Sequence, residues 1–431
     1  MLYPNLGVGE NGRLFFAGHD TVELARSYGT PLVVMDESLI RSRCRTYKAA
    51  LAEDLPAGSR PLYASKAFCC RRMCAIAQEE GLGLDVVSPG ELYTALLAGF
   101  PAEDIFFHGN NKTDADIRFA IESRIGYIVC DNRYELAAIE REAAALGVRQ
   151  KILLRITPGI DPHTHEKINT GRVDSKFGSA IDTGDADVIT GEALKAPHVD
   201  LRGFHCHVGS QLFDCSPLCD AAEIMVAFLR AMRDRYGYDC EILNLGSGFG
   251  VRYEESDPAI DYAAETRRVT ARIRAACAEQ DISVPVVLLE PGRSIVADAG
   301  ITLYTVGGIK HIPGLRNFVS VDGGMTDNPR FTLYQAVHGV LDASHADAKP
   351  SGYYTVAGRC CESGDRLAEG APLPRMERGD VLAMLTTGAY TYSMASNYNR
   401  VARPAVVFLG EQGPYIAVRR ETFQDLTACD V

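Results

Sequence analysis

The 431-residue sequence has no apolar run near the roughly 18 residues that a membrane-spanning helix needs. Positive charge is also in deficit, because 44 lysines and arginines face 56 aspartates and glutamates and leave a net charge of -12. Such a chain is a poor partner for nucleic acid or an anionic membrane, so we expect neither. The first ten residues lack the basic and apolar regions of a signal peptide. These absences predict a cytoplasmic protein.

The sequence also lacks C-x-x-C pairs at the spacing of a zinc site, although it contains 13 cysteines. The cysteine count is odd. Two pairs are adjacent, at Cys69-Cys70 and Cys360-Cys361, where a disulfide would close a strained ring. We therefore expect most of the thiols to be reduced and buried as small apolar side chains.

Residues 61 onward alternate short apolar runs with longer amphipathic ones, and 46% of the chain is hydrophobic, enough for two domains. The expected strands are Leu62–Ser65, Leu84–Ser88, Ile105–His108, Tyr127–Cys130, Lys151–Thr157, Leu201–Val208, Glu241–Leu245 and Val284–Leu289. Eight strand–helix units predict an α/β fold, a TIM-type (β/α)8 barrel over residues 31–290. Their regularity favours this closed barrel over an open, doubly wound sheet.

After Glu290 the sequence changes to strand-like runs separated by Gly and Pro, with little helical periodicity. This pattern predicts a C-terminal all-β domain. The first 30 residues also look like strands and turns, so we expect residues 1–30 and 291–431 to form that β domain together. The stretch Asp161–Ser179 is too polar and Gly-rich for a helix, and we expect an ordered loop beside the fifth barrel strand.

A lysine, Lys66, follows the apolar run Pro61–Ser65, the first expected barrel strand. Barrels carry out their chemistry at the C-terminal ends of their strands. A buried strand end should desolvate the amine and lower its pKa. A neutral amine can form a Schiff base with a carbonyl, which is how lysine carries pyridoxal 5'-phosphate. A lone lysine here is more often a surface side chain, so its neighbours decide the interpretation.

Those neighbours are unusually polar. The expected strand ends carry Asp85, Ser88, His108, Asn110, Asn111, Asp131, Arg155, His207, Gly246 and Glu290. Barrels commonly bind phosphate after their seventh and eighth strands, where the segment Gly246–Gly250 lies, although a tight turn explains such glycines equally well. Glu290 opens a Glu-Pro-Gly-Arg turn. A buried carboxylate needs a partner, and a pyridinium nitrogen would be suitable.

His205 and His207 alternate around Cys206, so on a strand they share one face. They could form a metal pair, or a ring could pack on a flat cofactor. The metal interpretation needs more ligands, and the sequence has no H-E-x-x-H motif and no third histidine clearly placed to help. We therefore expect no metal.

The expected β domain contains three further candidate segments. The turn Cys360–Asp365 carries a thiol, Gly388–Asn399 is a polar and aromatic loop, and Arg330 with Tyr334 follows the glycines at 323 and 324. Each alone is more often structural than functional. Their co-occurrence in this order favours a ligand site.

The motifs together resemble the alanine-racemase-like (fold type III) pyridoxal phosphate decarboxylases, and within them the diaminopimelate decarboxylases. The resemblance extends from about Leu32 to Leu409. It rests on Tyr63–Lys66, Ser88–Leu92, His205–Gln211, Gly246–Gly250, Glu290–Arg293, Cys361–Asp365 and Gly388–Tyr390. It implies decarboxylation of meso-2,6-diaminopimelate to L-lysine and carbon dioxide, the last step of lysine biosynthesis by the diaminopimelate route.

The resemblance also implies residue roles. Lys66 would carry pyridoxal 5'-phosphate, His207 would stack on its ring, and Glu290 would pair with the ring nitrogen. The phosphate would be surrounded by Ser210, Gly248, Gly292, Arg293 and Tyr390. The substrate would be held by Arg293, Arg330, Tyr334, Glu362 and Tyr390. Cys361 would supply a proton from the partner subunit, which implies a homodimer with shared active sites.

Two residues depart from the family pattern. Ser247 stands where the middle of three glycines is usual, and Phe331 stands where proline commonly follows the substrate arginine. Three alternatives remain open: an ornithine, arginine or carboxynorspermidine decarboxylase of the same fold, a non-catalytic homologue that binds pyridoxal phosphate, and a metal-dependent hydrolase. A distal carboxylate on the substrate calls for arginines such as Arg293 and Arg330, and this favours diaminopimelate.

Overall fold

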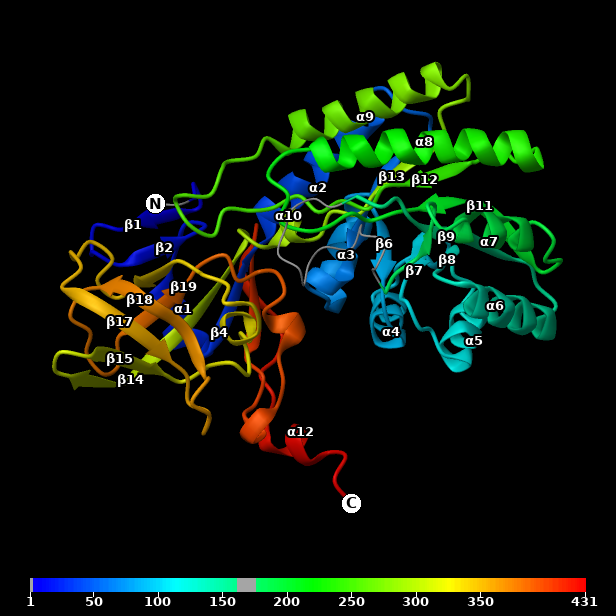
Figure 1. The fold of residues 1–431 in the computed structure, drawn as a ribbon. Coiled ribbons are helices and arrows are strands. Elements are labelled where there is room, and N and C mark those ends of the chain that lie inside the picture. The colour runs from blue at the N-terminus through cyan, green and yellow to red at the C-terminus, as the bar shows by residue number, and fades with distance from the viewer. Residues whose placement is uncertain (1–2, 161–175) are drawn as a thin grey trace. The chain divides into compact units, whose positions relative to one another are not determined.

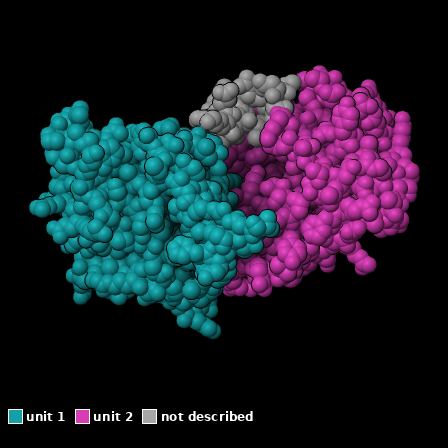
Figure 2. Space-filling view, turned by 90° about the horizontal axis from the view of Figure 1, so that it is seen from below, with its two compact units in different colours: residues 1–40, 251–258, 293–431 teal, residues 41–250, 259–292 magenta. Residues whose placement is uncertain are grey.

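The computed structural model describes residues 3–160 and 176–431 and forms two compact units. The barrel unit comprises Arg41–Gly250 and Ala259–Gly292. The β unit comprises Met1–Ile40, Val251–Pro258 and Arg293–Val431 (Figure 2). Most of the loop expected at Asp161–Ser179 lies outside the described residues.

Eight parallel strands close the barrel, as predicted (Figure 1). They are β5 (Arg60–Ala64), β6 (Gly83–Val86), β7 (Ile105–Phe107), β8 (Tyr127–Cys130), β9 (Gln150–Thr157), β11 (Val199–His205), β12 (Ile242–Asn244) and β13 (Val286–Leu289). The ring closes where Leu289 of β13 pairs with Pro61 of β5. A two-residue strand, β10 (Ser179–Ala180), adds to β9.

The strands form because each is a short, almost fully buried apolar run, and the core joins their side chains. Leu62, Phe106, Val129, Leu153 and Leu288 are at most 2% exposed and pack in one cluster. Burying one such side chain stabilises the fold by about 1.5–3 kcal/mol.

Helices alternate with the strands. They are α2 (Glu37–Ala52), α3 (Arg71–Glu79), α4 (Pro89–Leu97), α5 (Asp114–Glu122), α6 (Arg133–Leu146), α7 (Asp185–Ala193), α8 (Ser216–Tyr236) and α9 (Tyr262–Glu279). Local sequence sets their ends. Asn132 accepts the Glu135 N–H at the start of α6, and Gly147 ends that helix at a φ of 66°. Figure 1 shows α8 and α9 side by side.

The β unit contains a nine-stranded sheet. Its strands are β4 (Leu32–Asp36), β14 (Gly300–Ile312), β15 (Arg316–Val321), β16 (Val340–Asp342), β17 (Gly352–Ala357), β18 (Arg366–Leu373), β19 (Val381–Met384), β20 (Ala405–Gly410) and β21 (Gly413–Val418). A small sheet of β1 (Leu6–Val8), β2 (Leu14–Phe16) and β3 (His19–Asp20) belongs to the same unit, with the helices α1 (Thr21–Tyr28), α10 (Arg293–Val296), α11 (Arg330–Tyr334) and α12 (Phe423–Thr427).

The strand β4 accounts for a difference from the expected boundary at residue 31. Met35 of this strand pairs with Gly300 of β14 on one side and with Phe408 of β20 on the other. The chain therefore enters the barrel unit only after Ile40. At the other end, the barrel unit reaches Gly292, two residues beyond the expected 290. Over residues 3–160 and 176–431, no helix is long and apolar enough to span a membrane.

Candidate active site

Lys66 lies in a short 3-10 turn, η1 (Ser65–Ala67), directly after β5. Neighbouring side chains fix this turn. The Tyr63 hydroxyl donates to the Phe68 carbonyl at 2.7 Å, and the Ser65 hydroxyl donates to Glu91 at 2.7 Å. Glu91 also accepts the Val87 N–H at 2.7 Å, so one carboxylate connects the ends of two neighbouring strands.

The side chain of Lys66 is exposed, so the expectation that a buried strand end desolvates it is wrong for this chain on its own. Burial ends at Ser65, and the turn directs the next side chain outward. Lys66 nevertheless lies near His207. Burial lowers the pKa of His207 well below its ordinary value, and the charge of Lys66 lowers that pKa further. The structure therefore brings together the predicted lysine and the predicted ring-stacking histidine.

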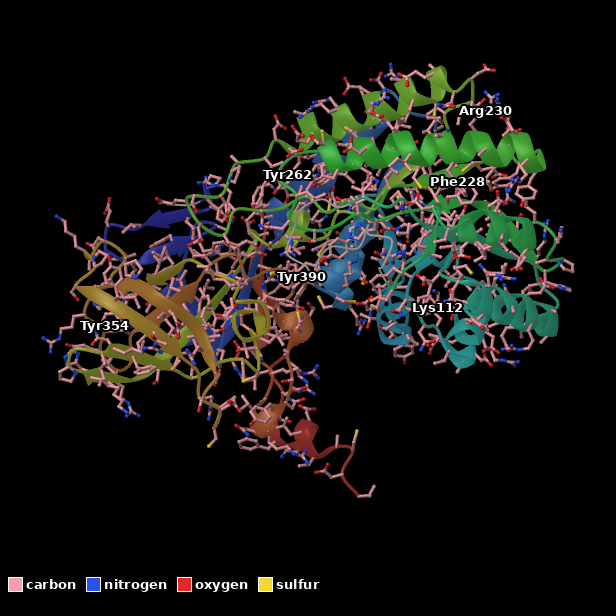
Figure 3. All side chains as sticks on the ribbon, viewed as in Figure 1. Lys112, Phe228, Arg230, Tyr262, Tyr354 and Tyr390 are labelled. Carbon is pink, nitrogen blue, oxygen red and sulfur yellow. The ribbon has the colours of Figure 1, made fainter. Side chains whose placement is uncertain are left out.

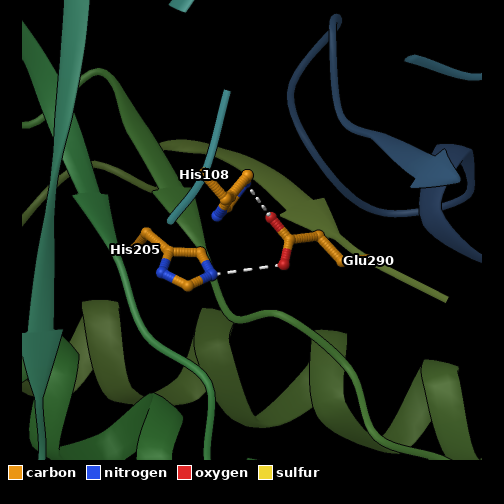
Figure 4. Close-up of side chains that lie close together, drawn as sticks. All are labelled: His108, His205 and Glu290. Carbon is orange, nitrogen blue, oxygen red and sulfur yellow. Dashed lines mark hydrogen bonds and ion pairs between the residues drawn. The ribbon is translucent and has the colours of Figure 1, made fainter. Parts of the chain in front are cut away.

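Glu290 is buried directly after β13 and is surrounded by hydrogen-bonding partners (Figure 4). The Asn244 amide donates to its Oε1 at 2.7 Å, and His205 Nε2 lies 3.2 Å from its Oε2. His108 Nε2 approaches Oε1 at 3.0 Å. These three partners come from the ends of β12, β11 and β7, so the closed barrel alone brings them to one carboxylate.

Glu290 is held as an anion. Burial by itself would raise its pKa, but His108 and His205 outweigh burial and hold the pKa well below its ordinary value. Asp85, whose Oδ1 lies 3.6 Å from His108 Nε2, behaves differently. Burial raises the pKa of Asp85 to about 6, against the opposing effect of His108. The strand ends therefore hold one firmly ionised carboxylate beside one that titrates near neutral pH.

The histidine beside Glu290 makes stability sensitive to acid. Burial lowers the pKa of His205 from 6.5 to about 4, although Glu290 opposes the shift. Between these pH values the unfolded chain binds a proton that the folded chain does not bind. The free energy of unfolding should therefore fall as the pH drops from about 6.5 to about 4, by at most about 1.4 kcal/mol per pH unit for this group.

Urea unfolding across this pH range would measure the effect. We expect a shallower pH slope for His205→Gln, which removes the titrating ring but keeps a donor for Glu290. The matched control is His311→Gln, because His311 is exposed on the β unit and should leave the slope unchanged. A slope for His205→Gln equal to that of the parent chain would contradict this prediction.

The glycine segment after β12 makes room for neighbouring backbone. A Cβ at Gly248 would lie 2.2 Å from the Gly209 carbonyl oxygen, and one at Gly246 would lie 2.6 Å from His207 Nδ1. Both glycines have positive φ, 62° for Gly246 and 122° for Gly248. The φ of Ser247 is not positive, so a residue with a side chain is tolerated at this position, where the family pattern has glycine. Its side chain is buried.

Gly292 brings the Glu290 turn against the Lys66 turn. A Cβ at Gly292 would lie 3.0 Å from both the Cβ and the carbonyl oxygen of Ala64. The Ala64 N–H donates to the Pro291 carbonyl at 3.2 Å, and the Glu290 N–H donates to the Gly246 carbonyl at 2.6 Å. The turns after β5, β12 and β13 are therefore connected through their backbones.

The β unit contains a second cluster, in which two buried arginines share a tyrosine. Arg293 donates to the Tyr253 hydroxyl at 2.7 Å, and the Arg330 guanidinium carbon lies 5.4 Å from the centre of the Tyr253 ring. Arg293 also lies over the Tyr390 ring at 4.8 Å, and Arg330 lies 5.9 Å from the Tyr334 ring. Figure 3 labels Tyr390 among the side chains of this unit. Four predicted substrate residues thus lie together.

Arg330 is only 8% exposed, and no carboxylate of the described residues forms an ion pair with it. Burial lowers its pKa, and the nearby charge of Arg293 lowers it further. A buried cation of this kind is costly unless an anion pairs with it. This arrangement is suited to binding a carboxylate or phosphate group. Phe331, the second departure, lies in α11 directly after Arg330.

Cys361 and Glu362 lie on an exposed turn of the same unit, and this turn contacts α11, because the Thr332 hydroxyl donates to the Gly364 carbonyl at 3.0 Å. The Cys361 N–H donates to Asn399 Oδ1 at 2.9 Å, and Asp365 accepts the Cys360 N–H at 2.7 Å. Among the described residues, the hydrogen bonds of Cys361 and Glu362 are confined to this turn and to Asn399. The structure thus groups the predicted residues Arg293, Arg330, Tyr334 and Tyr390, whereas the hydrogen bonds of Cys361 and Glu362 go to other residues.

Three residues of these clusters were given no role by the sequence analysis. Asn244 supports Glu290, Tyr253 connects two arginines, and His108 had been noted only as one polar strand end. A polar side chain inside the apolar run Ile242–Leu245 was a usable signal for Asn244. No local signal identified Tyr253. The structure also places His108 and Glu290 beside His205, with their ligand atoms within 4.8 Å of one another, so a second histidine does lie close to His205, contrary to the sequence expectation.

Comparison with known proteins identifies the class. Residues 37–297 match the family model for the pyridoxal-binding domain of pyridoxal-dependent decarboxylases. Diaminopimelate decarboxylase of Bacillus subtilis is 46% identical over 98% of this chain and 96% of its own length. A crystal structure of diaminopimelate decarboxylase from M. jannaschii in co-complex with L-lysine has a TM-score of 0.90 and 34% identity, covering 99% of this chain and 98% of that one.

The chain is therefore a pyridoxal-dependent decarboxylase by fold and family model. Within that class it belongs to the diaminopimelate decarboxylase family. A lysine/ornithine decarboxylase from Vibrio vulnificus, complexed with putrescine, also matches, with a TM-score of 0.74 over 90% of this chain and 98% of that one. At 24% identity, this match shows a shared fold only.

The residues of the barrel unit fit the family's cofactor, pyridoxal 5'-phosphate. A carboxylate offers about four acceptor positions, and Glu290 has only three partners among the residues described above, so one position remains for a ring N–H. The positive-φ glycines let the backbone after β12 lie close to His207 and Gly209, where any Cβ would collide with them. Lys66 is the accessible amine beside them.

Proposed function

We propose that this chain decarboxylates meso-2,6-diaminopimelate to L-lysine and carbon dioxide with pyridoxal 5'-phosphate as cofactor. The observation that carries the choice of substrate is the buried Arg330, which has no carboxylate partner among the described residues. Diaminopimelate keeps one carboxylate after losing the other, and the retained group would neutralise this cation. Identity of 46% to a diaminopimelate decarboxylase over nearly the whole chain supports the same substrate.

The barrel unit would hold the cofactor. Lys66 would bind it covalently, and His207, which is close to Lys66, would pack on its ring. When bound, the cofactor draws the electrons of the breaking C–C bond into its protonated ring. Glu290 would keep the ring nitrogen protonated by accepting a hydrogen bond from it. The pKa of Glu290 lies far below neutral pH, so this carboxylate stays an anion. Backbone at Ser210, Gly248 and Gly292 would bind phosphate, with Arg293 and Tyr390 as the predicted contacts from the β unit.

The β unit would bind the substrate through Arg293, Arg330, Tyr334 and Tyr390, with Glu362 as the predicted partner of the distal amine. Cys361 would return a proton to the α-carbon after carbon dioxide leaves. Its exposure on a turn, where a second subunit could reach it, supports a homodimer in which Cys361 and Glu362 serve the partner's site. All 13 cysteines are free, which supports a reducing compartment such as the cytoplasm.

Substrate preference tests this proposal. We expect kcat/KM for meso-diaminopimelate to exceed that for L-ornithine or L-lysine by roughly a hundredfold or more, because a bare distal amine supplies no anion for the buried Arg330, at a cost of about 3–5 kcal/mol. Arg330→Gln should lower kcat/KM for diaminopimelate strongly. It should therefore bring that value closer to kcat/KM for L-ornithine and L-lysine. Arg316→Gln, an exposed arginine of the same unit, is the matched control. Comparable kcat/KM for ornithine in the parent chain would overturn the substrate assignment.

A further inference from the structure

The segment Val251–Pro258 follows β12 in the chain but folds with the β unit. It is held by its own hydrogen bonds. The Asp257 carboxylate accepts the backbone N–H of Tyr253 at 2.8 Å and that of Glu254 at 3.1 Å, and Arg252 donates to the Asp257 carbonyl at 2.8 Å. This loop therefore fixes the backbone from which Tyr253 projects, before any ligand arrives.

The Tyr253 side chain is buried and contacts three charged or titratable groups. Its hydroxyl accepts from Arg293 at 2.7 Å, and its ring centre lies 5.4 Å from the guanidinium carbon of Arg330. The His338 ring stands edge-on to it, at a centroid distance of 5.1 Å and an angle of 88°. One phenol thus connects both arginines and one histidine.

Two buried guanidinium groups repel each other, and the repulsion must be offset before a substrate can use them as a pair. The charge of Arg293 lowers the pKa of Arg330. The phenol oxygen accepts from one guanidinium, and the electron-rich ring attracts both cations. Tyr253 therefore reduces the repulsion without supplying a carboxylate, which would compete with the substrate for the arginines.

His338 orients the Tyr253 ring and adds no third positive charge. Its Nδ1 lies 3.0 Å from the Leu385 carbonyl, which fixes the ring and assigns the proton to Nδ1. Burial and the charge of Arg330 together lower the pKa of His338 to about 3, so the ring is neutral at physiological pH. The T-shaped arrangement of the His338 and Tyr253 rings is favourable for an aromatic pair.

We propose that Tyr253 is a positioning residue that holds Arg293 and Arg330 as a preformed clamp for the carboxylate that the substrate keeps. This inference rests on the proposed function, which supplies the retained carboxylate. The Tyr253 hydroxyl positions Arg293, and the Tyr253 ring positions Arg330. The hydrogen bonds within Val251–Pro258 hold Tyr253 in place for both contacts. The clamp should matter for every ligand with that carboxylate and for no ligand without it.

A pair of amines tests the clamp. L-lysine and 1,5-diaminopentane differ only in the carboxylate, so the ratio of their dissociation constants, measured by calorimetry on the holoenzyme, reports the carboxylate subsite alone. In the parent chain we expect L-lysine to bind more tightly. Tyr253→Phe keeps the ring but loses the hydrogen bond to a charged group, and it should reduce the ratio roughly tenfold or more. Tyr253→Leu removes the ring as well and should reduce the ratio further.

The matched control is Tyr28→Phe, which removes one tyrosine hydrogen bond, 3.2 Å to the Pro414 carbonyl, from the same unit. It should leave the ratio unchanged. If Tyr253 has only a general structural role, its replacement should weaken the binding of both amines equally and leave the ratio of dissociation constants unchanged. An unchanged ratio in Tyr253→Phe and Tyr253→Leu therefore overturns the clamp. A parent chain that shows no preference for L-lysine overturns the proposed function instead, so the two failures are distinguishable.

Discussion

The Lys66→Ala chain is expected to lose both the covalently bound cofactor and decarboxylation. Lys66 is the accessible amine at the end of β5, and the Glu290 turn lies against its own turn through Gly292. Lys112, also near the strand ends, cannot replace it. Its ammonium group is buried, lies 2.7 Å from Glu135 and donates to the Gly109 and Val129 carbonyls at 2.7 and 2.9 Å.

Borohydride provides the direct measurement. It reduces the bond between cofactor and amine to a stable one, and digestion of the parent chain should then yield a labelled peptide containing Lys66. Lys66→Ala should yield no labelled peptide, and its visible absorbance should be that of free cofactor. Lys151→Ala is the matched control, because Lys151 is exposed near the start of a barrel strand rather than beyond its end. A labelled peptide from Lys66→Ala would show that another residue binds the cofactor.

Mixing two inactive variants is expected to restore activity if active sites are shared between subunits. Lys66→Ala removes the amine of the barrel unit and Cys361→Ala removes the thiol of the β unit, so each variant dimer is inactive. Exchange of subunits makes half of the dimers hybrids, and each hybrid has one site with both native residues. Recovery should approach about a quarter of parental activity, by the statistics of two-fold assembly.

The double variant Lys66→Ala/Cys361→Ala gives the converse test. In a hybrid with the parent chain, one site lacks the amine and the other lacks the thiol, so both sites are inactive. Equal mixing should therefore reduce the activity per parent chain to about half. Sites built within one chain would show no such loss and no recovery in the first mixture. Cys429→Ala, which removes another exposed thiol, is the control and should be fully active.

The barrel could be predicted from the sequence because its strands are short apolar runs at regular spacing, and all eight are present in the structure. The polar residues at the strand ends predicted the location of the site, because parallel strands bring their C-terminal ends to the same end of the barrel. Glu290 was identified in this way. Its partners His108 and Asn244 were not assigned, because they belong to distant strands and only barrel closure brings them together.

The errors have physical causes as well. Lys66 was expected to be buried because the preceding strand is buried, but η1 turns its side chain outward. The expected barrel boundary at residue 31 differs from the unit boundary after Ile40, because β4 pairs with β14 and β20 and local pattern cannot say which sheet will accept a strand. Tyr253 was missed because its partners Arg293, Arg330 and His338 are remote in sequence.

The position of β4 between β14 and β20 has a consequence for synthesis of the chain on the ribosome. Met35 pairs with Gly300 and Phe408, so this apolar strand must wait for both partners to be translated. At about 5–20 residues per second the delay is on the order of tens of seconds. The barrel unit can fold during that interval, whereas the β unit cannot finish before translation is nearly complete. An N-terminal fragment released early would therefore expose the apolar run Leu32–Met35, a natural binding site for a chaperone.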